Sequence, residues 1–444
     1  MMRSMFASVS GLKSHQTMMD VIGNNISNVN TIGYRASRVT FKEVFNETLR
    51  GAGAPDSATG RGGTNPMQIG LGTGVGSVDT ITTRGSLQRT ENPTDLSIEG
   101  DGFFIVRGGD GDTYKFTRAG DFIIDKLGNM VTSGGLNVYG WHQYTRDPNS
   151  GEYIFDTERD IEPINLFSDE YNKNKRIIAA KSTENIELSG NLDASLKADA
   201  AGPYQFTVPV FVYDSLGNEY KINVQFRKNI VNAGDPSASP PTQPTTVWDW
   251  KIDDIDGGGG VQDGQLTFDH EGNIILDGSE KSVLTFIPSA DVGAGSFNAT
   301  IDFSKLTMFA GDSSVKPTFT DGYPTGSLVS FNIGADGVIS GIYSNGRQQP
   351  LGLIAMAAFE NPAGLMRAGD NTYTPTTNSG DFKRALKAGS EGVGTINPGT
   401  LEMSNVDLAK QFTDMIVTQR GFQANSRIIT TTDEMLQELA NIKR

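Results

Sequence analysis

The two ends of this chain carry a helical pattern that the sequence between them lacks. In residues 2–26, apolar or small side chains recur at steps of three and four, and a similar spacing returns between residues 406 and 442. Apolar residues at i, i+3, i+4 and i+7 are typical of a helix with one buried face. The fold must therefore bury a helical stripe at each end, and it must do so around a middle of different character.

Heptad columns predict which side chains these helices bury. One N-terminal column holds Met5, Leu12, Met19 and Ile26, and Val9 stands in the column beside it. At the other end an unbroken apolar column accompanies a mostly polar one that starts at Phe412. Because such columns form the seams of coiled coils, we predict that the helices pair with each other and with helices of neighbouring subunits. The predicted interface residues are Met5, Val9, Leu12, Met19, Ile26, Leu408, Phe412, Met415, Phe422, Ile429 and Leu436.

Polar, glycine-rich segments lie between the helices and the middle of the chain. Residues 51–66 contain almost no apolar side chains, so burial cannot offset the entropy of ordering them. We expect a connecting segment at 31–76 and a second flexible stretch at 389–400. Asn405 is expected to cap the C-terminal helix.

The sequence between these segments is typical of short strands joined by turns. Runs rich in β-branched and aromatic residues alternate with glycine, aspartate and asparagine, at a spacing typical of sandwiches and barrels. The first set of predicted strands is 103–106, 114–117, 122–125 and 130–132, with related strands at 327–333, 338–343 and 351–359. The second set is 204–213, 219–227, 248–252, 264–268, 273–277 and 283–287.

These patterns predict a mainly β fold with α-helical termini and nested, discontinuous domains. The terminal helices, 1–30 and 404–444, would form a coiled-coil inner layer. The segments 77–146 and 318–403 would form a first sandwich- or barrel-like β domain, and 147–317 a second β domain inserted between them.

Composition excludes several classes of function. The net charge is −15, whereas nucleic-acid binders present basic patches and anionic membranes attract basic segments. The chain has no cysteine, so a disulfide, a thiolate zinc site and an iron–sulfur cluster are excluded. Polar residues interrupt residues 3–16, so we expect no secretory signal peptide, and no apolar stretch is long enough for membrane insertion.

Motifs for catalysis or cofactor binding are absent. The glycines of 70–76 lack the dinucleotide-binding spacing, and no G-x-S-x-G elbow occurs. His15, His142 and His270 lie in different predicted modules without an i, i+4 partner. The acidic runs at 110–112 and 253–256 are expected to be solvated turns. We therefore predict no catalytic residue, cofactor or metal, although the abundant carboxylates leave a hydrolase of the all-β class open.

Two long terminal motifs resemble the signatures of the flagellar rod and hook axial proteins. One covers residues 22–35 and runs on to Phe41, and the other covers 404–426. The first includes a turn after the helix, where asparagines can cap and glycine can take a positive φ. The signature residues of this turn are Asn24, Asn25, Asn28, Asn30, Gly33 and Tyr34.

Segments of the middle, at 212–218 and 343–359, look like those of hook members of this family. The resemblance implies a structural subunit, not an enzyme, that is exported unfolded by the flagellar type III apparatus. Such subunits polymerise outside the cell envelope into the curved, flexible universal joint between rod and filament, which serves motility. Implied partners are further copies of the chain, the rod, the hook cap and the hook–filament junction proteins.

Two other hypotheses remain open from the sequence. One is a distal rod or other flagellar axial subunit. The other is a carbohydrate-binding or hydrolytic all-β protein of the cell surface, which does not explain the paired terminal heptads.

Overall fold

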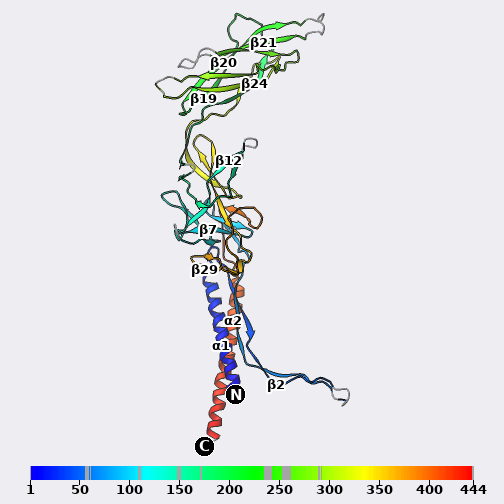
Figure 1. Cartoon of the computed structure of the whole chain (residues 1–444), viewed down its shortest axis with the longest axis vertical. Coiled ribbons are helices and arrows are strands. Elements are labelled where there is room, and N and C mark those ends of the chain that lie inside the picture. Colours follow the sequence, from blue (N-terminus) through cyan, green and yellow to red (C-terminus); the bar gives the residue numbers. More distant parts are fainter. Residues whose placement is uncertain are drawn as a thin grey trace. The chain divides into compact units, whose positions relative to one another are not determined.

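The computed structural model describes residues 2–55, 60, 62–108, 112–147, 152–170, 173–234, 243–252, 262–288, 291 and 293–442. In these residues the α-helices are α1 (Met2–Ser27) and α2 (Leu408–Ile442), and strands dominate between them (Figure 1). The chain divides into two compact units. Unit 1 contains Met1–Lys173, Phe331–Ser340 and Pro350–Arg444, and unit 2 contains Asn174–Ser330 and Gly341–Gln349.

Unit 1 holds both helices and most of the short strands. Its strands are β1 (Ser37–Glu43), β2 (Asn46–Arg50), β3 (Met67–Gly70), β4 (Thr73–Thr80), β5 (Leu87–Arg89), β6 (Leu96–Glu99), β7 (Phe103–Arg107), β8 (Lys115–Thr117), β9 (Phe122–Ile124), β10 (Met130–Thr132), β11 (Asn137–Trp141), β12 (Tyr144–Arg146), β13 (Tyr153–Phe155), β14 (Glu162–Pro163), β15 (Ser168–Asp169), β29 (Met366–Gly369), β30 (Thr372–Thr374), β31 (Leu386–Lys387), β32 (Thr395–Pro398) and β33 (Thr400–Glu402). A 3₁₀ turn follows Asn361 at Pro362–Gly364.

The main sheet of unit 1 runs in the order β28 (Gln348–Ala357), β11, β7, β8, β30, β29, and its pairs are antiparallel. β28 also pairs with β7, through Met356 and Phe104. The core on this sheet is largely aromatic, with Phe103, Phe116 and Trp141 buried together with Leu353. Aromatic rings fill much volume and meet edge to face, as Phe103 and Tyr373 do at 5.7 Å between centroids.

The segment predicted as a connector forms two antiparallel ribbons. β1 pairs with β4, and β2 pairs with β3. Gly53 and Thr64 continue the second ribbon through reciprocal hydrogen bonds of 2.9 Å, while 56–59 and 61 of the predicted flexible stretch lie outside the described residues. Backbone pairing orders this segment without a hydrophobic core, which composition does not reveal.

The second predicted flexible stretch, 389–400, is also ordered, so that prediction is wrong. β32 pairs with β6 in a register that places Ile396 opposite Ile98, and both side chains are fully or almost fully buried. The glycines of this stretch serve close contacts: a Cβ on Gly394 would lie 2.1 Å from the carbonyl oxygen of Glu99. Here glycine marks tight packing rather than flexibility.

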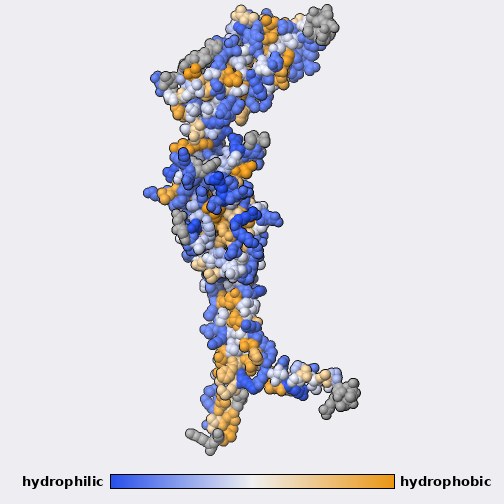
Figure 2. Space-filling view, in the orientation of Figure 1, coloured by the Kyte–Doolittle hydropathy of each residue, from blue (hydrophilic) through white to orange (hydrophobic). Residues whose placement is uncertain are grey.

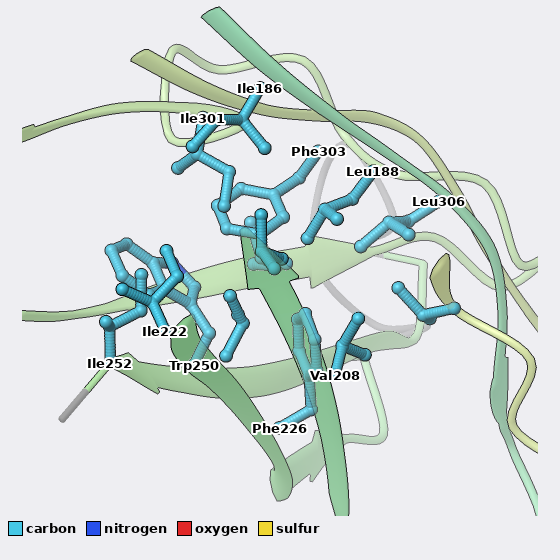
Figure 3. Packing of buried hydrophobic residues seen from close by; sticks show 14 of the residues in the cluster. Ile186, Leu188, Val208, Ile222, Phe226, Trp250, Ile252, Ile301, Phe303 and Leu306 are labelled. Carbon is cyan, nitrogen blue, oxygen red and sulfur yellow. The ribbon is translucent and has the colours of Figure 1, made fainter. Parts of the chain in front are cut away.

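Unit 2 is a sandwich of two four-stranded sheets. One sheet has the order β23-β24-β18-β25, in which β18 and β24 are parallel, and the other has the antiparallel order β19-β20-β21-β22. Inward-facing side chains of both sheets, including Phe226, Trp250 and Phe303, form one continuous core (Figure 3). The strands are β16 (Lys173–Asn174, which starts in unit 1), β17 (Ile177–Ile178), β18 (Asn185–Asp193), β19 (Phe206–Tyr213), β20 (Glu219–Asn232), β21 (Thr245–Ile252), β22 (Gln262–Phe268), β23 (Lys281–Phe286), β24 (Phe297–Phe309) and β25 (Lys316–Thr320).

Besides β16, three described strands have residues in both units: β26 (Gly326–Ile333), β27 (Val338–Tyr343) and β28. The predicted class, mainly β with helical termini, is confirmed. The predicted strands are found except 273–277, which makes only isolated bridges. Asp110 and the acidic run at 253–256, which were expected to form solvated turns, lie outside the described residues.

Residues 147–173, predicted to belong to the inserted domain, fall in unit 1, where Phe155 joins the core. The four-part domain division stays a prediction.

Three turns share the motif D-x-x-G-N, at 125–129, 214–218 and 269–273. In each, the aspartate accepts backbone N–H groups two and four residues later, at 2.8–2.9 Å. The glycine has φ of +96°, +90° and +86° respectively, a conformation that a side chain disfavours. Burial alone would raise the pKa of the fully buried Asp214. The hydrogen bonds from Asn218, Tyr220 and Leu216 outweigh burial, and its pKa is lowered.

We predict that Asp214→Asn destabilises unit 2 and flattens its response to acid. A carboxylate whose pKa is lowered on folding stabilises the fold above its unfolded pKa of about 4, and this contribution is lost as pH falls through the folded pKa. The substitution should cost about 1–3 kcal/mol near neutral pH. Urea unfolding between pH 7 and pH 2.5 measures both effects. Asp263→Asn, at an exposed position, is the control and should leave the pH profile unchanged.

Candidate assembly site

The two terminal helices pack side by side and antiparallel within unit 1 (Figure 1). Nδ2 of Asn25, near the end of α1, donates to Oε1 of Gln411, in the first turn of α2, at 3.1 Å. Further along, Gly11 faces Asn425 and His15 faces Gly421. The register shows that the last two turns of α2 extend past the first residue of α1.

Small and polar side chains line the seam between the helices. The buried residues of α1 are Ser8, Gly11, Ser14, Ile22 and Asn25, and those of α2 are Gln411, Thr418 and Thr432. A Cβ on Gly11 would lie 2.8 Å from Nδ2 of Asn425, and one on Gly421 would lie 2.7 Å from Cε1 of His15. Glycines therefore allow this close approach, as small residues do wherever helices meet closely.

The predicted interface residues lie beside this seam rather than at its centre. Val9, Leu408 and Phe412 are exposed, with Phe412 at 51%. The others are partly buried: Met5, Leu12, Met19, Ile26, Met415, Phe422, Ile429 and Leu436. The predicted α1 columns are one position away from the buried columns. Heptad patterns are recognised by large apolar residues, whereas the closest contacts between the helices are made at Gly11 and Gly421.

Large apolar side chains face away from the seam on both helices. Figure 2 shows hydrophobic atoms gathered over this part of the molecule. The exposed large apolar side chains of the two helices are Met2, Phe6, Val9, Leu408, Phe412, Ile416, Val417, Ile428, Met435, Leu439 and Ile442, each at least 40% exposed. Isolated exposed apolar residues are common, but so many on one helix pair indicate an interaction surface.

The ribbon β1–β4 covers one further face of α1. Oγ of Ser10 receives the N–H of Thr73 at 3.3 Å, and Oγ of Ser14 lies 3.4 Å from the carbonyl oxygen of Thr73. The ring of His15 meets that of Phe41 edge to face at 5.7 Å. α1 is thus held by α2 on one side and by a two-stranded ribbon on another.

Asn25 joins α1, the chain that follows it and α2. Its Oδ1 accepts the N–H of Ser37 at 2.9 Å and the hydroxyl of Tyr34 at 3.2 Å, and its Nδ2 donates to the Ser37 carbonyl at 2.8 Å as well as to Gln411. The side chain is 1% exposed. Of the other signature asparagines, Asn24 and Asn28 bond each other at 2.6 Å, and Asn30 is exposed.

Gly33 and Tyr34 complete the turn. Gly33 has φ +67°, its N–H donates to the carbonyl of Glu402 at 2.7 Å, and a Cβ there would lie 2.7 Å from the backbone nitrogen of Ala119. No other residue fits both the dihedral angle and the space. The ring of Tyr34 is buried and stacks under the guanidinium of Arg367 at 5.1 Å.

Glu402 is a buried carboxylate between two buried arginines. It lies 2.8 Å from Nη1 of Arg35 and 3.4 Å from Nη1 of Arg118, and it also accepts the N–H of Gly85 at 3.1 Å. Glu402 lies six residues before α2, and Arg35 eight residues after α1. We call Asn25, Gly33, Arg35, Arg118, Glu402 and Asn405 the helix junction. Sequence reasoning missed the charged members; the only signal was the position of Arg35 inside one terminal motif and of Glu402 beside the other, and Arg118 had none.

The prediction that Asn405 caps α2 is wrong. Asp407 caps it, because its Oδ1 accepts the N–H of Lys410 at 3.2 Å. Asn405 instead accepts the N–H of Ala36 at 2.7 Å and donates to the carbonyls of Ile81 and Thr83 at 3.0 and 2.9 Å. It ties the chain before α2 to the strands that follow α1.

The described residues contain no cluster of three or more histidines, aspartates and glutamates that could hold a metal ion. His142 lies in the core of unit 1, where its Nε2 is 2.9 Å from the carbonyl oxygen of Pro163. Neither described helix carries an apolar stretch of the length that crossing a bilayer requires. The contacts of the terminal helices are those of a helix-packing interface.

Comparison with known proteins identifies the family. The chain is 39% identical to the flagellar hook protein FlgE of Borreliella burgdorferi and 36% identical to that of Treponema pallidum, and each alignment covers all of both chains. The chain belongs to the flagellar hook protein family. This is a family of structural proteins, so the predicted resemblance and the prediction that the chain is not an enzyme are confirmed.

Family descriptions cover both ends and both units. Residues 5–35 match "Flagella basal body rod protein", and 397–442 match "Flagellar basal body rod FlgEFG protein C-terminal". Residues 97–166 match the hook protein "FlgE/F/G D1 domain", and 185–323 match the "FlaE D2 domain". The crystal structure of Helicobacter pylori flagellar hook protein FlgE2 has a similar fold, with a TM-score of 0.51 at 16% identity over 71% of this chain and all of that one.

We predict that Asn25→Ala detaches the start of α2 from α1. The substitution leaves the Ser37 backbone groups and the Gln411 amide without their buried partner, which should cost about 1–3 kcal/mol or more. Far-UV circular dichroism during urea unfolding measures the loss of helix. Asn24→Ala, at the exposed neighbouring position, is the matched control; equal losses in both variants would contradict the role of Asn25.

We further predict that alanine has different effects at the two glycines inside α1. A Cβ on Gly23 would meet no atom within 4 Å, so Gly23→Ala should stabilise the helix by up to about 1 kcal/mol. Gly11→Ala gains the same propensity but crowds Asn425, so it should be neutral or destabilising. Helix melting followed at 222 nm compares the two. Equal stabilisation would show that the close seam does not form.

Proposed function

We propose that this chain is the structural subunit that self-polymerises into the flagellar hook, the curved and flexible joint between rod and filament. The observation that supports this most is the uncovered apolar surface of the terminal helices, which remains after they have paired with each other. A helix pair of this kind is completed by neighbours that bury the outward side chains. Further copies of the chain supply those neighbours, and the inner layer of a helical tube is the arrangement that repeats the contact.

The end of α2 adds to this argument. Residues after about 434 have no counterpart on α1, and Met435, Leu439 and Ile442 are 49%, 48% and 78% exposed. An unpaired helix end with exposed apolar side chains is only marginally stable in water. A neighbouring subunit that stacks below would bury it.

Export and the remaining partners follow from the same proposal. The subunit would leave the cell unfolded through the flagellar type III apparatus and assemble outside the envelope. It would contact the rod at one end, the cap during growth and the junction proteins at the filament end. Membership of the hook protein family supports these partners and a location in the flagellum.

A rod subunit is the second candidate. The flagellar basal-body rod protein FlgG of Bacillus subtilis is 30% identical to this chain, over all of both chains. The two higher identities are both to hook proteins, which favours the hook. Electron microscopy of the polymer separates the two: a curved, flexible tube supports the hook, and a straight, rigid one the rod.

We predict that Phe412→Asp blocks polymerisation while the folded monomer survives. The ring of Phe412 is half exposed on the monomer, and its burial between subunits should contribute about 1.5–3 kcal/mol, or roughly 10- to 150-fold in critical concentration. Gln419→Asp adds the same charge at an exposed polar position of the same helix. Sedimentation of polymer across a concentration series measures both.

Deleting residues 408–444 is the stronger form of this test, and it keeps Asn405 and Glu402 in place. The truncated chain should remain soluble, keep its β-sheet signal in circular dichroism and fail to sediment. Tubes of normal length from either the truncated chain or Phe412→Asp would contradict the proposed role of the helices.

A further inference from the structure

The ribbon β2–β3 in unit 1 is a sheet of two strands in the described part of the chain. A two-stranded ribbon is at best marginally stable in water unless a helix or further strands pack on it. Arg3 of α1 holds its base, because the two Nη atoms of Arg3 lie 2.9 and 3.0 Å from the carboxylate oxygens of Glu47. A further contact along the ribbon would therefore stabilise it.

The register of the ribbon separates its apolar from its polar side chains. Ile69 is opposite Glu47 and Met67 is opposite Arg50, so these four side chains share one face. Gln68 points to the other face, because successive side chains of a strand alternate. Ile69 and Met67 are 44% and 51% exposed. We call Glu47, Arg50, Met67 and Ile69 the ribbon face, and it presents apolar side chains and a cation to solvent.

The end of α2 carries a complementary stripe. Met435, Leu439 and Ile442 are spaced at i, i+4 and i+7, so they lie on one side of the helix, and each is at least 48% exposed. Glu438 lies on the same side, three residues after Met435 and four before Ile442. Residues 428–442 contain three acidic residues and no basic one, and the C-terminal end of a helix attracts cations. This stripe therefore suits a partner that combines apolar side chains with a cation.

We propose that the ribbon face binds the end of α2 of a second copy of this chain, with Arg50 beside Glu438; the proposal rests on the assembly proposed above and names the surface that buries the end of α2. The register between the helices places Arg3, which holds the ribbon, level with about residue 433. Leu439 lies about six residues further on, or about 9 Å at 1.5 Å per residue. A copy shifted along the helices by about this distance therefore presents Leu439 at the level of Ile69.

Cysteine cross-linking tests the contact directly, because the chain has no cysteine of its own. Ile69→Cys and Leu439→Cys, prepared as separate variants and polymerised together, should form a disulfide-linked dimer on mild oxidation, whereas each polymerised alone should not. A disulfide requires Cα atoms within about 7 Å of each other. Gln68→Cys, on the opposite face of the ribbon, is the matched control and should give little dimer with Leu439→Cys.

Charge exchange provides an independent measurement. Arg50→Glu should raise the critical concentration for polymerisation by about 1.5- to 5-fold, as expected for the loss of an exposed ion pair. Adding Glu438→Arg to the same chain should reverse this loss, because the pair is restored with its charges exchanged. Lys42→Glu changes an exposed cation of the neighbouring strand β1, and Glu438→Arg should not rescue it. Sedimentation of polymer across a concentration series measures all four chains.

The outcomes separate this contact from the assembly itself. Tubes that form without the mixed dimer of Ile69→Cys and Leu439→Cys, or with as much dimer from Gln68→Cys, would overturn the ribbon contact and leave the assembly proposal standing. A dimer of Ile69→Cys with itself in place of the mixed dimer would show that ribbons pair with each other, and would also overturn it. If the unsubstituted chain forms no tubes, the assembly proposal and this contact are both wrong.

Discussion

The carboxylate of Glu402 is the contact on which the arrangement of unit 1 depends. It joins Arg35, which follows the first helix, to Arg118 on the β domain, and it belongs to the segment that leads into the second helix. The Glu402 carbonyl also receives the Gly33 N–H, so its backbone and its side chain both hold the signature turn. Removing one partner of a buried ionic group leaves an uncompensated charge, which is strongly destabilising. The chain after α1, the strand region at Arg118 and the chain before α2 therefore depend on this one carboxylate for their relative positions.

In the helix pair, small side chains lie in the seam and large apolar side chains lie on the outer faces. Glycine, serine and threonine allow α1 and α2 to approach closely, but they bury little apolar area and so contribute little hydrophobic stabilisation. The large apolar residues point outward, where within one subunit nothing in the described part of the chain covers them. A pair built in this way is weakly stable alone and gains most from further neighbours. The reverse arrangement, with Phe412 and Ile416 inside, would give a stable monomer with a polar and non-adhesive surface.

The sequence predicted the fold class and the strands of both units well, because alternating apolar residues and glycine-rich turns report local backbone structure. It predicted the signature turn only in part: Gly33 takes the positive φ that was expected, but Asn24 and Asn25 lie inside α1, which runs to Ser27, and not in the turn that follows it. It misplaced the α1 seam because Gly11 carries no apolar signal, although it makes one of the closest contacts with α2. It also missed Glu402, Arg35 and Arg118, since ion pairs between residues hundreds of positions apart leave no periodic pattern. The segments 51–66 and 389–400 are too polar to predict order from burial, but strand pairing depends on backbone groups that composition does not show.

The bond between Asn25 and Gln411 spans 386 residues of chain. Because synthesis proceeds from the N-terminal side, the contact cannot form until all of the chain between Asn25 and Gln411 has been made. A product that stops between Met403 and Gln411 retains the strands of both units yet lacks the seam that completes α1. The closing of this very long loop thus makes the paired helix surface depend on both segments: only a chain that contains Asn25 and the start of α2 presents it.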